Sequence, residues 1–174
     1  MDVTGSVGTE LCNGNYADFC LGSFGKWKPV NLGYGGFLSA KEKEFFEMPR
    51  EIFNTISFDA TYFPELLKRL DNLKKRYELF NKLNKKIKKD LKDFNILHKD
   101  KAGINVIIKF GDNQEKEKII NYCDKNNLEY TICPKGIFSL IKVNCNAISI
   151  EVKRIEWLVL MMATVKEDTP LVSF

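Results

Sequence analysis

The sequence has few cysteines, a single histidine and no long hydrophobic run. Its five cysteines are an odd number without a C-x-x-C pair, and His98 stands among lysines, which together argue against a disulfide framework and a zinc site. The N-terminus has no basic segment followed by a long apolar run. Residues 157–165, the longest late apolar run, fall far short of the roughly 20 residues that span a bilayer. We therefore predict a cytoplasmic protein with no membrane segment and no metal site.

The charge of the chain is concentrated in one segment. The chain has 174 residues, of which 44% are apolar, and a net charge of +4, with residues 67–101 holding most of the surplus. Apolar residues recur there at spacings of three and four, which indicates an amphipathic helix whose outer face is solvated lysine. No aromatic residue interleaves the lysines on the polar side. We therefore predict no nucleic-acid partner, and keep binding through this basic helix as the weaker alternative.

The apolar pattern predicts an α/β fold with an α+β C-terminal part. The first segment, 1–62, has predicted strands at 17–24 and 36–40, a short helix closed by Pro49 and an irregular stretch at 50–62, and the second, 63–96, is one long helix from Pro64 to about Phe94. The third segment, 97–154, has predicted strands at 104–110, 129–134, 138–144 and 147–155 and a helix at 113–127. The tail 155–174 follows. These predictions rest on periods of two and 3.6 residues and on Gly and Pro boundaries.

A glycine-rich stretch at 22–36, GSFGKWKPVNLGYGG, contains five glycines and two lysines. Reversing the chain needs only one or two glycines, so the others need a further explanation. A lysine in such a turn at the end of a buried strand can form a Schiff base with an aldehyde cofactor, provided that its pKa is lowered. Pyridoxal phosphate is that cofactor, and it also needs a carboxylate opposite its ring nitrogen and donors for its phosphate. Asp2, Ser23 and Lys28 supply groups of these kinds, in that order along the chain.

At these residues the sequence resembles the DegT/StrS-type sugar aminotransferases, which share the large pyridoxal phosphate-dependent fold of aspartate aminotransferase. The family pattern D-x-x-[HQ]-x-x-G reads DVTGSVG here, its strand ending in S-F reads SFGKWK, and K-x-x-x-x-G-x-G-G reads KPVNLGYGG. The resemblance covers about residues 2–154. It implies that Lys28 is the Schiff-base lysine, Asp2 the partner of the pyridine nitrogen and Ser23 a phosphate ligand. Gly5 departs from the pattern, because the family has His or Gln there.

The same resemblance implies the architecture and the function of the chain. Residues 1–62 would be part of the cofactor-binding large domain, 63–96 the long connecting helix and 97–154 the small C-terminal α+β domain, followed by the tail 155–174. The implied reaction is transfer of an amino group to a keto-sugar. Because Asp2 is nearly the first residue, we predict a truncated chain that is inactive alone. The resemblance further implies a homo-oligomer, or pairing with a separately encoded N-terminal half.

Each of these residues also has a simpler interpretation. Lys28 can be a solvated loop lysine, Asp2 a frayed terminal residue, and Ser23 a hydroxyl that caps its own turn. The matching alternative for the whole chain is a noncatalytic remnant or assembly module that pairs with another chain. Whether the chain is an enzyme stays open at this point.

Overall fold

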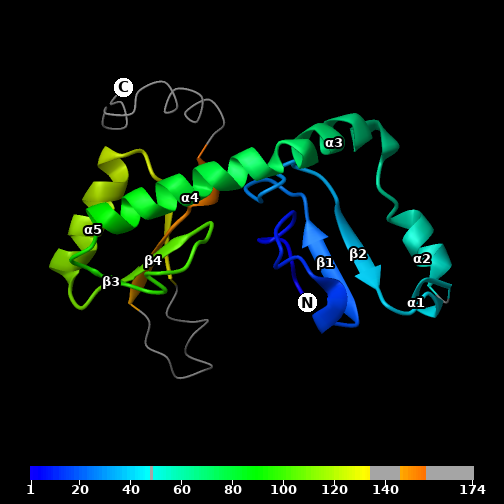
Figure 1. The fold of residues 1–174 in the computed structure, drawn as a ribbon, viewed down its shortest axis with the longest axis horizontal. Coiled ribbons are helices and arrows are strands. Elements are labelled where there is room, and N and C mark those ends of the chain that lie inside the picture. Colours follow the sequence, from blue (N-terminus) through cyan, green and yellow to red (C-terminus); the bar gives the residue numbers. More distant parts are fainter. Residues whose placement is uncertain (48, 134–145, 156–174) are drawn as a thin grey trace. The chain divides into compact units, whose positions relative to one another are not determined.

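The computed structural model describes residues 1–47, 49–133 and 146–155. They form two compact units, residues 1–77 (unit 1) and 78–174 (unit 2). The architecture is mixed α+β with two small antiparallel sheets (Figure 1), so the coarse fold class is confirmed. The predicted strand at 138–144 and the tail beyond residue 155 lie outside the described residues. Among the described residues, no helix is long and apolar enough to cross a membrane.

Unit 1 is built on a β-hairpin. Strand β1 (Phe19–Ser23) pairs antiparallel with β2 (Gly36–Ala40), both inside the predicted strands. The first residues of the chain run parallel to the other edge of β1, with a 2.8 Å hydrogen bond from the Val3 N–H to the Leu21 carbonyl. This third segment positions the side chain of Asp2 beside β1, a placement that the sequence pattern did not predict.

The rest of unit 1 is helical and encloses a small core. Its helices are the 3₁₀ turns η1 (Gly14–Tyr16) and η2 (Ala60–Tyr62) and the α-helices α1 (Glu44–Glu47), α2 (Arg50–Thr55) and α3 (Phe63–Asp71). Helix α2 and η2 occupy the stretch that we predicted to be irregular. The core consists of the buried residues Val7, Phe24, Val30, Leu66 and Leu73.

The single long helix that we predicted is two helices in the structure. Helix α3 ends at Asp71 and α4 (Leu73–Asp90) begins after Asn72. The Asn72 side chain donates to the Lys68 carbonyl at 2.8 Å, and its N–H bonds to the same helix end. An asparagine that satisfies local backbone groups in this way offers an alternative to continuing the helix. The apolar residues keep their helical spacing across Asn72, and for this reason the sequence pattern did not reveal the break.

Unit 2 is a four-stranded antiparallel sheet with a helix on it. Its elements are β3 (Asn95–Ile96), β4 (Val106–Lys109), α5 (Asn113–Lys125), β5 (Tyr130–Ile132), β6 (Ala147–Ile150) and the 3₁₀ turn η3 (Val152–Arg154), and the strand order is β3-β4-β6-β5. All four residues of β6 are buried. Strand β6 is therefore a central strand that ends at Ile150, and the prediction of a longer strand paired on one face was wrong.

Two polar side chains of α4 donate hydrogen bonds to the loop that connects β3 and β4. The amide of Asn84 donates to the carbonyls of Gly103 and Asn105, at 2.9 and 3.2 Å. The Lys88 ammonium donates to the carbonyls of His98 and Lys101, at 3.1 and 2.6 Å. Partial burial lowers the pKa of Lys88. This lysine therefore holds the loop, whereas the sequence pattern predicted a solvated lysine.

Candidate functional site

Folding brings the predicted residues Asp2 and Ser23 together through Thr4. The Thr4 backbone N–H donates to Asp2 Oδ1 at 2.9 Å, and the Thr4 hydroxyl accepts from the Ser23 N–H at 2.9 Å. Hydrogen bonds from the Thr4 hydroxyl and backbone N–H lower the pKa of Asp2. The Asp2 carboxyl is therefore an ordered, ionised group, and the interpretation as a frayed terminal residue does not describe it.

Lys28 is linked to the same cluster through its charge. Its positive charge is a further, smaller cause of the lowered pKa of Asp2. The side chain of Lys28 is half-buried. The neighbouring Lys26 is directed elsewhere, with its Nζ 4.6 Å from the centre of the Trp27 ring. Of the two loop lysines, it is Lys28 whose charge affects a predicted site residue.

The loop that carries Lys28 has a strained backbone. The Lys28 N–H bonds to the Gly25 carbonyl at 3.2 Å, which closes a four-residue turn. Trp27, the third residue of that turn, has φ = 68°, a conformation that is normally left to glycine or asparagine. A bulky residue in this region costs about 1–3 kcal/mol, and such strain is found disproportionately at functional sites.

Two of the three glycines that follow Lys28 in this stretch, Gly35 and Gly36, are explained by close packing. A Cβ on Gly36 would lie 2.4 Å from the carbonyl oxygen of Gly22 on the facing strand. Gly35 has φ = 73°, and a Cβ there would lie 2.4 Å from the Phe58 ring. The glycines therefore allow the strands and an aromatic ring to approach closely. This packing is the further explanation for Gly35 and Gly36, and it requires no cofactor.

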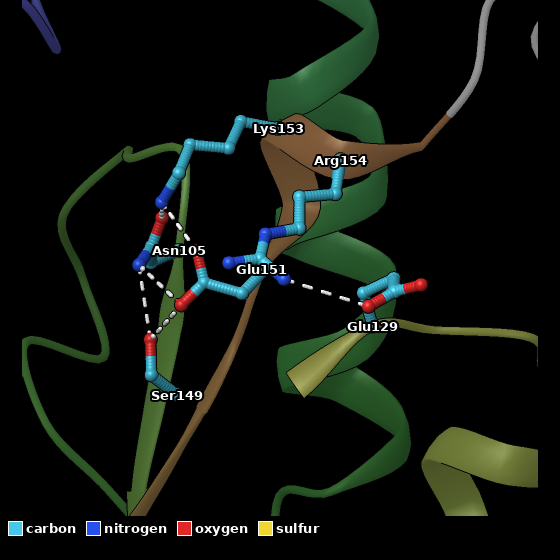
Figure 2. Close-up of polar contacts among 6 residues, drawn as sticks. All are labelled: Asn105, Glu129, Ser149, Glu151, Lys153 and Arg154. Carbon is cyan, nitrogen blue, oxygen red and sulfur yellow. Dashed lines mark hydrogen bonds and ion pairs between the residues drawn. The ribbon is translucent and has the colours of Figure 1, made fainter. Parts of the chain in front are cut away.

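Unit 2 contains a second polar cluster, which the sequence did not predict (Figure 2). The Ser149 hydroxyl donates to Glu151 at 3.0 Å, and the Asn105 amide donates to Ser149 at 2.9 Å. Lys153 donates to both Asn105 and Glu151. Because the carboxylate already binds the serine hydroxyl and an ammonium, this arrangement does not form a nucleophile and base pair. We name this cluster the Glu151 network. We interpret its role as structural, because it links β4 and β6 at one end.

The Glu151 network continues to an ion pair at its rim. Arg154 Nη1 lies 3.5 Å from Glu129 Oε2, and the Glu129 side chain is 62% exposed, against 8% for Glu151. Figure 2 shows the Glu129 and Arg154 pair beside the buried carboxylate. One carboxylate in this region is therefore buried and multiply bonded, and the other is largely solvated.

Comparison with known proteins identifies the family through the second half of the chain. The MJ1341 family C-terminal domain matches residues 71–172. The chain belongs to the MJ1341 family. The match includes α4 and unit 2, with the Glu151 network, and leaves the Lys28 cluster of unit 1 outside the matched range. No curated protein and no solved structure matches the chain.

Membership of the MJ1341 family overturns the resemblance to the DegT/StrS-type sugar aminotransferases. That resemblance rested on short motifs of glycine, serine and lysine, and the structure accounts for Gly35 and Gly36 by close packing. Short motifs of small residues recur wherever strands approach closely, so their order alone is weak evidence of descent. The spatial cluster of Asp2, Ser23 and Lys28 is a separate observation, and it does not depend on that family.

Proposed function

We propose that unit 1 binds an aldehyde-bearing, anionic ligand covalently at Lys28, with pyridoxal phosphate as the expected cofactor. The observation that supports this proposal is the cluster formed by Asp2, Thr4, Ser23 and Lys28. Condensation of a lysine amine with an aldehyde forms a carbon–nitrogen double bond and releases water, after the ammonium has lost its proton.

The donor set of the cluster fits pyridoxal phosphate. The ionised Asp2 carboxylate can pair with a protonated ring nitrogen, and the Lys28 amine can bond to the aldehyde carbon. The Ser23 hydroxyl accepts a hydrogen bond from the Gly25 N–H at 3.1 Å, and it can donate its own hydrogen to a phosphate oxygen. When bound, the cofactor supplies an electron sink for amino-acid chemistry. Amino transfer to a keto-sugar stays a prediction with no further support from the structure.

Each residue of the cluster has a distinct task in this proposal. Lys28 holds the ligand and, when displaced from it, can accept and return a proton as a general base. Asp2 keeps a proton on the nitrogen of the ligand by its negative charge, and the hydrogen bonds from Thr4 keep that carboxylate ionised and oriented.

Reductive trapping tests the proposal. Purified chain is mixed with equimolar pyridoxal phosphate at neutral pH and reduced with borohydride, and the modified lysine is identified by peptide mapping. We expect the label on Lys28, its loss in Lys28→Gln, and its retention in the matched variant Lys26→Gln from the same loop. Label spread evenly over the lysines of α4, with Lys28 unmodified, would contradict the proposal.

A second candidate function is docking of another chain on the hairpin of unit 1. One face of the hairpin carries Phe19, Leu21 and Leu38, which are 44%, 48% and 39% exposed. Leu21 lies directly opposite Leu38 in the register of β1 and β2, so the three side chains are contiguous. The other face, with Cys20 and Gly22, is buried. Contiguous exposed apolar side chains of this kind make the face a candidate interaction surface.

Charge substitution on this face tests the second candidate. Leu21→Lys should lower self-association or partner binding by at least about tenfold, because a buried unpaired ammonium is strongly unfavourable in an interface. Leu67→Lys is the matched control, since Leu67 is 60% exposed on α3 and lies outside the hairpin. Multi-angle light scattering at micromolar concentration gives the state of association. A wild-type chain that is monomeric and unchanged by Leu21→Lys would argue against an apolar docking surface between copies of this chain.

A further inference from the structure

We infer that Asn31 is a positioning residue for Lys28, acting through the strained backbone of Trp27. This inference rests on the proposed function of Lys28. The Asn31 side-chain oxygen accepts a hydrogen bond from the Trp27 N–H at 2.8 Å. Trp27 is the residue immediately before Lys28, so its backbone conformation decides the direction in which the Lys28 side chain leaves the loop.

The conformation of Trp27 needs an external hold. Its φ of 68° lies in the left-handed region, which a tryptophan populates poorly on its own because its Cβ crowds the backbone. The hydrogen bond from its N–H to Asn31 stabilises this conformation, since in an extended Trp27 the N–H would point away from Asn31. Asn31 itself has φ = 53°, which asparagine tolerates better than most residues. The two left-handed residues therefore form one interlocked turn.

Asn31 is in turn fixed to the body of unit 1. Arg69 on α3 donates through Nη1 to the Asn31 carbonyl, and its Nε donates to Glu65 at 2.8 Å on the same helix. Between Lys28 and Asn31, the residues Pro29 and Val30 are fully buried. The chain is thus anchored directly after Lys28 by burial and directly before it by the hydrogen bond that the Trp27 N–H donates to Asn31.

The consequence is a Lys28 backbone that is held on both sides. A reacting amine must be placed within about half an ångström of its productive position, and loops reach this precision only when supporting residues fix them. Asn31 supplies this support without touching the ligand, which makes it a positioning residue and not a catalytic one.

Labelling ratios in three variants test the inference. Chain is treated with equimolar pyridoxal phosphate and borohydride, and the label on Lys28 is divided by the label on Lys43, whose side chain is 86% exposed. Asn31→Ala should lower this ratio by about tenfold, since the hydrogen bond that the strained Trp27 N–H donates to Asn31 is then lost. Asn31→Asp keeps an acceptor oxygen and should keep the ratio. Trp27→Gly added to Asn31→Ala should restore it, because glycine adopts positive φ freely.

The outcomes separate the inference from the function on which it rests. A wild-type ratio near one would overturn the proposed function and the inference together. A high wild-type ratio that Asn31→Ala leaves unchanged would overturn the inference alone. Recovery in the double variant supports it, since a merely structural role predicts further damage when Trp27 is removed. If Asn31→Ala alone does not fold, the double variant Trp27→Gly with Asn31→Ala decides. A labelling ratio that stays high in the double variant supports the inference, and a low ratio overturns it.

Discussion

Replacing Glu151 by alanine should destabilise unit 2 by about 3 kcal/mol, within the range of about 3–5 kcal/mol for removal of one partner of a buried ion pair. The Glu151 side chain is 8% exposed and that of Lys153 is 16% exposed. The substitution also removes the acceptor of the Ser149 hydroxyl and of the Asn105 amide. Hydrogen bonds to charged groups contribute about 1.5–3 kcal/mol each, but not additively, so we take the lower end of the range.

Urea unfolding followed by circular dichroism measures this effect. With a slope of about 1–3 kcal/mol/M, a loss of about 3 kcal/mol lowers the midpoint by about 1–3 M. Glu129→Ala is the matched control, because its ion pair with Arg154 is 62% exposed on the Glu129 side and should contribute about 0–1 kcal/mol. Glu151→Gln keeps the shape and one acceptor and should fall between the two.

The reasoning fails if Glu151→Ala unfolds within about 1 kcal/mol of the wild type, as the control should. Such a result would mean that desolvation of the carboxylate cancels its bonds in the folded state. If Glu151→Ala does not fold, Ser149→Ala tests the same network more gently, with an expected loss of about 1 kcal/mol for one neutral hydrogen bond.

Three further predictions concern other parts of the chain. Burial alone would raise the pKa of Asp90, but hydrogen bonds from Tyr122 and Lys86 lower it. The stability that Asp90 adds is therefore present above its unfolded pKa and lost as pH falls through its folded pKa. In acid unfolding curves, Asp90→Asn should make the free energy of unfolding depend less on pH. Gly35→Ala should destabilise unit 1 more than Gly33→Ala in thermal unfolding, because both have positive φ but only Gly35 would meet an aromatic ring; equal losses would show that strain alone matters. Duplex DNA should bind the lysines of α4 weakly and be released at physiological salt, and sub-micromolar binding that persists there in a fluorescence titration would contradict a merely solvated face.

The sequence predicted those elements whose signals are local. Helix α5 (Asn113–Lys125) lies within the predicted 113–127, because Asp112 caps it by accepting from the Glu115 N–H at 2.8 Å and apolar residues follow with helical spacing. The hairpin strands were found because apolar runs lie beside glycines. The break at Asn72 was missed because a side-chain bond to the preceding turn leaves the apolar stripe unchanged.

The candidate site likewise has residues that the sequence predicted and residues that it missed. Asp2, Ser23 and Lys28 were chosen for their chemistry; in the structure Thr4 hydrogen-bonds to Asp2 and to Ser23, and Lys28 acts on Asp2 through its charge. Thr4, which joins two of them, was missed because its position depends on the register between the first residues and β1, which no local pattern encodes. The glycines were misread because the facing groups, Phe58 and the Gly22 carbonyl, are close to them only in the folded chain. The Glu151 network joins residues 44 positions apart, Asn105 and Ser149, which likewise leaves no local signal.

The ammonium of Lys88, which donates to two loop carbonyls, affects how the surface of α4 can be engineered. Programmes that alter solubility by exchanging surface lysines treat every such position as equivalent. Acetylation or exchange to glutamate at Lys88 would remove a cross-link between a helix and a loop, whereas the same change at the exposed Lys89 alters only charge. A map of lysine acetylation rates along α4 would therefore show one protected position inside a reactive run, and would give a direct report of loop attachment in solution.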